Sequence, residues 1–281
     1  MAATPKARRL GAAMRRVRED QGVGLRDLAA RLQRDPGSVS RWERGERTPK
    51  PEHVAQYLTA LGMAGEKYDQ IMALSHDPDA PLWAATTLPE QQQQLAALVD
   101  TEEKATCITS VAPLLVSGLL QTEEYMRAIM AGGGVSQTDA ISRVAIRKSR
   151  QGVITRANPV KLVAFLGEPV LRQVIGSPAV MREQFSHIRK FTGYPNVSVR
   201  IIPFDRGWNP ALEGPFDLIE SDHEVPVVQL EARTSGFFLH EESDVSAYRA
   251  AVRMIDDRAF DAEKSARLIE GAIQRLDKEL T

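Results

Sequence analysis

Residues 35–45 read DPGSVSRWERG, and this stretch decides the fold of the N-terminal part of the chain. Asp35 is a strong N-cap residue, and Pro36 suits the first position of a helix, where a missing N–H loses no hydrogen bond. Gly45 then supplies a residue that tolerates the left-handed conformation found after helix ends. The stretch therefore predicts a short helix from Pro36 to Arg44.

Two further helices are predicted before this one. Leu10, Met14, Val17 and Arg18 recur at helical spacing, and Gly22 closes that helix. The second helix begins near residue 24 or 25, and its expected buried positions are Leu25, Leu28, Ala29 and Leu32. The small side chain at position 29 lets the second and third helices approach closely. Two short helices joined by a tight turn predict a helix-turn-helix.

The third helix has an inner and an outer face. Val39 and Trp42, three residues apart, are expected to face inward and anchor it. The outer face or its border then holds Pro36, Gly37, Ser38, Ser40, Arg41 and Arg44. The N-terminal end of such a helix enters the major groove of DNA.

This part of the sequence resembles the phage-repressor-like XRE class of regulators. SRWERGERTP at residues 40–49 is similar to the signature of that class, and VAQYLTALG at residues 54–62 is similar to its fourth helix. The resemblance covers about residues 10–74 and implies a sequence-specific DNA-binding module. One position departs from the class: Gln33 replaces the usual glycine, and a left-handed conformation there would cost ~1 kcal/mol.

The resemblance also implies which residues contact DNA. It places Pro36, Gly37 and Arg41 at base-facing positions, and Ser40 lies beside them. Within this set, Arg41 alone has donors suited to a bidentate contact, for which guanine is the usual target. The residues expected to contact phosphates are Arg26, Ser38, Arg44, Arg47 and Lys50.

Charge is distributed unevenly along the chain. Residues 1–50 hold 13 Lys and Arg against 6 Asp and Glu, and the remainder holds 23 against 31. A basic head on an acidic body suggests that the head alone meets a polyanion. The sequence has one cysteine, no apolar run near the ~18 residues of a membrane helix and no secretory signal at its start. We expect a cytoplasmic protein that associates with the nucleoid when it is bound to DNA.

The remainder of the chain alternates predicted helices and short strands. Helices are expected at about 90–104, 122–131, 137–152, 178–192, 243–257 and 262–279, and strands at 162–166, 197–201, 216–219 and 225–228. The sequence thus predicts an all-α helix-turn-helix domain followed by a mixed α/β (α+β) domain. We place the DNA-binding domain at residues 1–75, a linker at 76–89 and a regulatory or partner-binding domain at 90–281.

The C-terminal part also resembles a known set of regulators. GLLQTEEY at residues 118–125 is similar to a segment of actinobacterial antitoxin-like XRE regulators, and so are RKSRQ at 147–151, PNVSVRIIPF at 195–204 and GPF at 214–216. These regulators are often encoded beside a small partner protein. The resemblance implies a domain that binds such a partner, in a toxin–antitoxin-like pair or a developmental switch.

No predicted feature indicates an enzyme. GGG at residues 132–134 lacks the Lys-Ser/Thr of a phosphate loop and is better placed as a helix end. Residues 222–224 and 240–242 carry metal-capable atoms but fit turns or helix starts better. Cys107 is expected to be a small buried thiol, and Trp208 to pack against the sheet or, as the alternative, to anchor an interface. We predict no catalytic residue, metal site or cofactor.

These observations predict a homodimeric transcription regulator that binds an operator in double-stranded DNA. Its C-terminal domain would receive a small partner protein or, as the alternative, sense a small molecule in an apolar pocket. The candidate dimer surface lies on the last helices, which have an equal claim to the internal core. Its apolar positions are Ile255, Ala259, Leu268, Ile269, Ile273 and Leu276.

Overall fold

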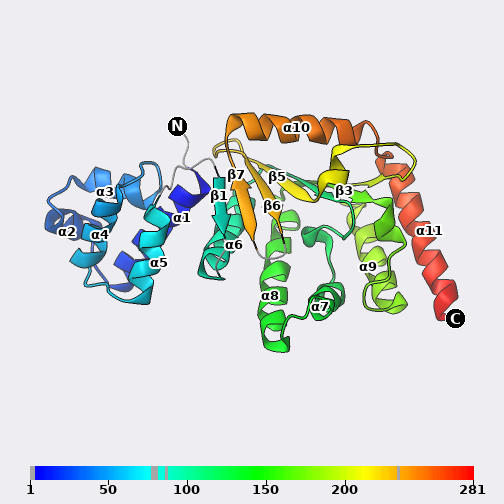
Figure 1. Cartoon of the computed structure of the whole chain (residues 1–281), viewed down its shortest axis with the longest axis horizontal. Helices are drawn as coiled ribbons and strands as arrows, with labels where there is room; N and C mark the ends of the chain where they lie inside the picture. The colour runs from blue at the N-terminus through cyan, green and yellow to red at the C-terminus, as the bar shows by residue number, and fades with distance from the viewer. Residues whose placement is uncertain (1–3, 77–81, 86–87, 233–234) are drawn as a thin grey trace. The chain divides into compact units, whose positions relative to one another are not determined.

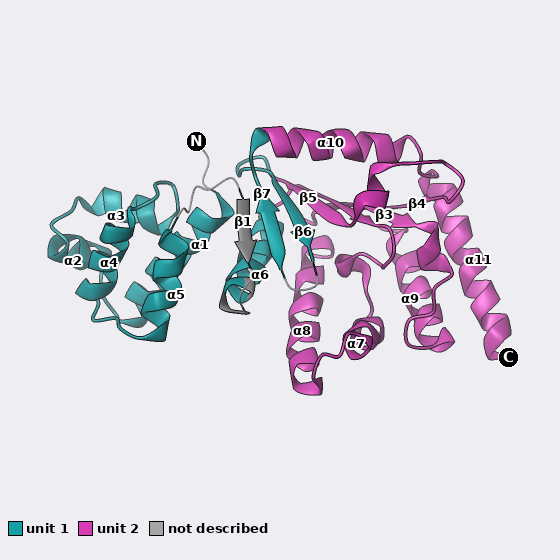
Figure 2. Cartoon of the chain, viewed as in Figure 1, with its two compact units in different colours: residues 1–104, 221–242 teal, residues 105–220, 243–281 magenta. Residues whose placement is uncertain are grey.

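The computed structural model describes residues 4–76, 82–85, 88–232 and 235–281. These residues form two compact units (Figure 2): residues 1–104 with 221–242, and residues 105–220 with 243–281. Residues 77–81 and 86–87 of the expected linker at 76–89 lie outside the described residues. The boundaries at 75 and 90 therefore stay a prediction.

The first unit begins with five helices, of which the first four are those predicted from the sequence (Figure 1). Their bounds are α1 Pro5–Asp20, α2 Leu25–Arg31, α3 Pro36–Glu43, α4 Pro51–Ala60 and α5 Glu66–Ser75. The Asp35 carboxylate caps α3 by accepting a hydrogen bond from Ser38 N at 2.8 Å. Gln33 has a φ of +50°, so the left-handed conformation expected at this position is present.

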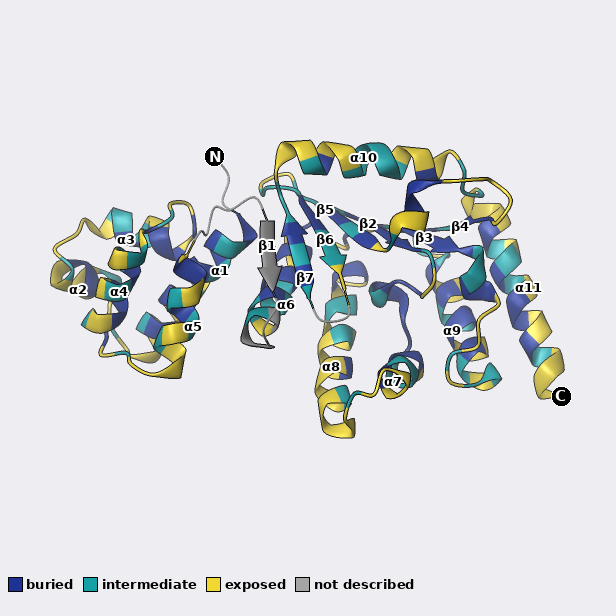
Figure 3. Ribbon diagram, in the orientation of Figure 1, coloured by how far each residue is buried: buried dark blue, intermediate teal, exposed yellow. Residues whose placement is uncertain are grey.

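Apolar residues from all five of these helices build one core (Figure 3). Its fully or almost fully buried members include Leu10, Met14, Leu28, Ala29, Val39, Tyr57, Leu58 and Ile71. The predicted inward positions of α1, α2 and α3 are thereby confirmed, apart from Leu25 and Leu32, which are half-buried. This packing fixes α3 between α1 and α2.

The first unit also contains a helix and three short strands. These are β1 Leu82–Ala85, α6 Leu88–Glu103, β6 Val227–Glu231 and β7 Gly236–Leu239. The strands are antiparallel in the order β1-β7-β6, with Leu82 opposite Leu239 and Val228 opposite the same residue on the other side. α6 packs against α1, so the helix-turn-helix shares this unit with segments from the middle of the chain.

The second unit is built on β2 Cys107–Ala112, β3 Lys161–Gly167, β4 Val197–Ile202 and β5 Phe216–Glu220. The order is β5-β2-β3-β4, in which β2, β3 and β4 are parallel and β5 is antiparallel to β2. Its helices are α7 Glu123–Gly132, α8 Gln137–Arg150, α9 Pro178–Phe191, α10 Glu242–Asp256 and α11 Ala262–Leu280. Four short 3-10 helices also occur within the described part: η1 Gly118–Leu120, η2 Gln151–Ile154, η3 Glu168–Leu171 and η4 Pro210–Glu213. The predicted fold class, an all-α head followed by an α+β domain, is confirmed.

Helices cover both faces of the strands in the second unit. α10 lies along one face, and α9 and α11 lie on the other (Figure 1). Ile269, Ile273 and Leu276 of α11 are buried, and α11 packs on α9 and β4. An ion pair between Arg182 and Asp277 at 2.7 Å borders this contact. Ile269, Ile273 and Leu276 therefore serve the internal core, as does buried Ile255, whereas Ala259 and Leu268 of the candidate dimer surface are half-buried.

Candidate nucleic-acid interface

The third helix presents its charged side chains outward. Val39 is fully buried and Trp42 is 5% exposed, as the sequence predicts. Arg41 and Arg44 are exposed, and so is Pro36 at the start of the helix. The helix therefore turns one apolar side inward and offers a basic outer face, the arrangement that a recognition helix requires.

Arg41 lies in the last turn of α3, and its side chain reaches back toward the start of the helix. Its Nη2 donates a hydrogen bond to Ser38 Oγ at 3.2 Å. A Cβ built on Gly37 would lie 3.5 Å from Arg41 Nη1 and 2.9 Å from Asp35 Oδ2. A side chain at position 37 would therefore crowd the capping carboxylate of Asp35, while the Arg41 guanidinium lies at an ordinary van der Waals distance from that Cβ position. The structure brings Gly37, Ser38 and Arg41 together on the end of α3 that would enter a groove.

Arg44 forms a second group with Ser40 and Glu46. Its guanidinium donates to the two Glu46 carboxylate oxygens at 2.7 and 3.0 Å and to Ser40 Oγ at 2.9 Å. These hydrogen bonds lower the pKa of the Glu46 carboxyl, so Glu46 is ionised at neutral pH. A phosphate would have to replace Glu46 as the partner of Arg44.

The remaining predicted phosphate contacts are also exposed. Arg26 lies in the first turn of α2, whereas Arg47 and Lys50 lie in the turn between α3 and α4. Arg47 N donates to Arg41 O at 3.3 Å, which folds this turn back on α3. Lys50 Nζ lies 3.9 Å from Glu52 Oε1, and both side chains are mostly exposed. Ion pairs of this kind are weak, so Lys50 can exchange its partner for a phosphate.

A buried ion pair joins the recognition helix to α1, and the sequence patterns did not predict it. Glu43 is 6% exposed, and its carboxylate accepts two hydrogen bonds from Arg18, both at 2.7 Å. The Tyr57 hydroxyl lies 2.6 Å from Glu43 Oε1. Burial and this hydrogen bond raise the pKa of Tyr57, and the hydrogen bonds to Glu43 raise the pKa of Arg18. The three side chains join α3 to α1 and α4.

Two glycines let α1 touch the end of α3 directly. A Cβ on Gly11 would lie 2.5 Å from Trp42 O and 2.8 Å from Glu43 O. Gly45 has a φ of +71°, and a Cβ there would lie 2.8 Å from Arg8 Cα. Any larger residue at position 11 would push α1 away from backbone atoms that cannot yield. The predicted C-terminal role of Gly45 is confirmed, while the close approach at Gly11 appears only in the fold.

The other polar clusters named in the sequence analysis form no metal-binding group within the described residues. No group of three or more His, Cys, Asp or Glu side chains in this part of the chain could hold a metal ion. Residues 222–224 are bends and residue 242 starts α10. α7 ends at Gly132, with Gly133 as its C-cap. Cys107 is half-buried, and burial raises the pKa of its thiol, so it is not an activated nucleophile.

Comparison with known proteins agrees with this description. Residues 9–70 match the model of a helix-turn-helix domain, which identifies the chain as a DNA-binding regulator rather than an enzyme. Residues 95–271, more than half of the chain, match the model described as "Domain of unknown function (DUF5753)". The chain belongs to this family of proteins with a DUF5753 domain.

More distant comparisons add little. No curated protein matches the chain. One solved structure with some likeness is TrmBL2, described as an archaeal chromatin protein with a novel mode of DNA binding. It is 14% identical, with a TM-score of 0.31, and the match covers 81% of this chain and 71% of that one. No helix of the described residues is long and apolar enough to cross a membrane.

Proposed function

We propose that the chain is a sequence-specific transcription regulator that reads the major groove of an operator with residues 36–44. The observation that carries this proposal is the exposure of Arg41 between buried Val39 and buried Trp42. Pro36 and Gly37 offer no side-chain donor, so Arg41 is the principal reader of bases and Ser40 a lesser one. Arg26, Ser38, Arg44, Arg47 and Lys50 hold the phosphates.

The regulator acts as a homodimer in this proposal. A single recognition helix reads only a few base pairs, and regulators of this architecture pair two half-sites about one helical turn (~34 Å) apart. The cytoplasm, with association to the nucleoid through DNA, is the compartment that fits these partners. Membership of the XRE class and an actinobacterial, antitoxin-like role rest on the sequence resemblance alone.

The dependence of binding on salt tests the number of phosphate contacts. Three or four phosphates on each protomer give a log–log slope of affinity against salt of about −5 to −7 for a dimer. A monomer with the same contacts gives a slope of about −3 to −4. Fluorescence anisotropy with a random-sequence duplex measures this slope. A slope near zero would show that the chain does not bind DNA through phosphate contacts. A slope near the monomer value would show that it does not bind as a dimer.

The second unit receives a small protein partner in this proposal. Within the described residues, several of its large apolar side chains are exposed in the segments that follow β2, β3 and β4: Leu114, Leu115, Val174, Phe204, Trp208 and Leu212. Trp208 is 57% exposed, so it does not pack against the sheet as first expected. β2, β3 and β4 are parallel neighbours, so their C-terminal ends lie on the same side of the sheet, and the segments that follow them begin there. We call these six exposed apolar residues the apolar edge.

Native mass spectrometry of the chain purified from its own host tests this partner. We expect a co-purifying small protein, whose release by Trp208→Ser would support the apolar edge as its site. A tightly retained small molecule would instead favour the alternative, a one-component sensor. A matched control is Met254→Ser on α10, a partly exposed apolar residue away from the segments after β2, β3 and β4.

A further inference from the structure

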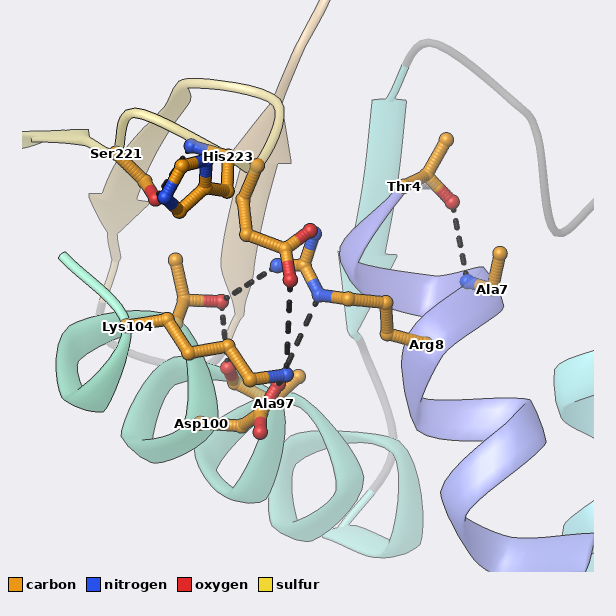
Figure 4. Close-up of polar contacts among 10 residues, drawn as sticks. Thr4, Ala7, Arg8, Ala97, Asp100, Lys104, Ser221 and His223 are labelled. Atoms are coloured by element: carbon orange, nitrogen blue, oxygen red, sulfur yellow. Dashed lines mark hydrogen bonds and ion pairs between the residues drawn. The ribbon is translucent and has the colours of Figure 1, made fainter. Parts of the chain in front are cut away.

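Arg8 in α1 carries a buried charge that lies outside the DNA-facing surface. The residue is 6% exposed. Its Nη1 donates to Glu224 Oε2 at 2.9 Å, and its Nη2 donates to Thr101 Oγ1 at 3.3 Å (Figure 4). Its Nε lies 3.7 Å from Asp100 Oδ2. One guanidinium therefore ties α1 to α6 and to the segment before β6, all within the first unit.

The same turn of α1 lies against the end of the recognition helix. The Cα of Arg8 would be 2.8 Å from a Cβ on Gly45, and Gly11, one turn later, approaches the carbonyl oxygens of Trp42 and Glu43 just as closely. Backbone meets backbone here, with no side chain between the two segments to absorb a movement. A displacement of Arg8 is therefore passed to residues 42–45 at the end of α3.

The partners of Arg8 lie where the chain leaves and re-enters its first unit. Asp100 and Thr101 come shortly before the passage at residues 104–105, and Glu224 comes shortly after the return at 220–221. In the second unit, the two connections are joined again, because Thr106 N donates to Glu220 O at 2.8 Å. A change in β5 thus reaches Glu224 through three residues of covalent chain, and a change in β2 reaches Thr101 through five.

We propose that Arg8 and its partners form a relay through which a change in the second unit alters the position of the recognition helix. The relay rests on the proposed function, because it gives the C-terminal unit a physical route to the DNA-binding surface. Lys104 balances the charges, with Nζ 3.0 Å from Asp100 and 3.7 Å from Glu224. Losing Glu224 removes the nearest carboxylate from a buried guanidinium, which keeps Asp100 at 3.7 Å, so the loss favours a displaced position of Arg8.

Hydrogen exchange of the full chain without DNA tests the relay. Glu224→Gln keeps the shape of the side chain and weakens its ion pair with Arg8. We expect exchange to accelerate in α1 and at residues 42–48, on the order of fivefold or more. The matched control is Lys104→Gln, which changes the same charge cluster without touching α1 and should leave residues 42–48 as they are. Acceleration confined to residues 221–226 would overturn the relay.

A second variant and a second condition guard against ambiguous results. Thr101→Val removes the other Arg8 acceptor with little change of shape, and it should loosen residues 42–48 even if Glu224→Gln fails to fold. Linkage is reciprocal, so binding of a random-sequence duplex of about 30 base pairs should slow exchange at residues 97–106 and 220–226. Wild type that binds the duplex without this slowing would overturn the relay. If the wild-type chain does not bind the duplex, DNA binding is refuted. The exchange rates measured without DNA then still decide whether the relay exists.

Discussion

Replacing Glu43 by glutamine tests whether the buried ion pair holds the recognition helix in place. The substitution keeps the shape of the side chain but removes the buried counter-ion of Arg18, which is 11% exposed, and leaves it only the more distant, exposed Glu19, whose Oε1 lies 3.7 Å from Nη2. Removing one partner of a buried ion pair costs about 3–5 kcal/mol. Glutamine retains one acceptor oxygen, and Arg18 Nη1 still donates to Val23 O at 3.0 Å. We therefore expect the lower end of the range, about 3 kcal/mol.

Urea unfolding of the full chain, followed by circular dichroism, measures this loss of stability. Hydrogen exchange of α1, α3 and α4 then shows whether the loss lies in the helix-turn-helix. The control is Arg15→Gln, which breaks an exposed pair with Glu19 on α1 and should change stability very little. If Glu43→Gln unfolds at the same urea concentration as this control, the buried pair does not hold α3 and the reasoning is refuted.

Three further predictions follow from individual contacts. Glu46→Gln should raise affinity for random DNA modestly and at low salt most of all, because it frees Arg44; equal affinities in an anisotropy titration would contradict this. Gly11→Ala should lower the melting temperature measured by calorimetry, since its Cβ would meet Trp42 O at 2.5 Å, whereas Gly271→Ala in α11, with open space around it and no positive φ, tests the glycine effect alone. Burial lowers the pKa of His187 below its usual 6.5, so the unfolded chain binds this proton more strongly than the folded chain. The free energy of unfolding should therefore fall as the pH drops below about 6.5. His187→Gln should make this fall smaller, as measured by urea unfolding midpoints at several pH values.

The sequence predicted the N-terminal helices well because local chemistry specifies them. Asp35 and Pro36 mark the start of α3, and the apolar spacing around Val39 identifies its inner face. Glu43 was not predicted as buried, since its partners Arg18 and Tyr57 lie 25 and 14 residues away and no local pattern links them. Burial of a carboxylate depends on tertiary partners, which periodicity does not reveal.

The part of the chain that follows α5 was predicted less completely. Six helices and three strands lie close to their expected positions, but β2, β7 and β1 were missed and the strand expected at 225–228 begins at Val227. β2 merges into the apolar stretch 111–120 that Pro113 interrupts, and β7 has only four residues. Short strands are defined by their neighbours: β2 is central because β3 and β5 pair with it. The Arg8 cluster was hidden for the same reason, since Glu224 lies 216 residues away.

The measurement that tests the central claim most directly compares Arg41→Ala with wild type on two DNAs at one salt concentration. The operator is first selected from a random-sequence duplex library with the full wild-type chain. On that operator we predict a loss of about 1–3 kcal/mol per half-site, because the proposal makes Arg41 the principal base contact. On random DNA the loss should not exceed that of one exposed positive charge. An equal loss on both DNAs, or a library that yields no enriched sequence, would contradict the claim that α3 reads bases through Arg41.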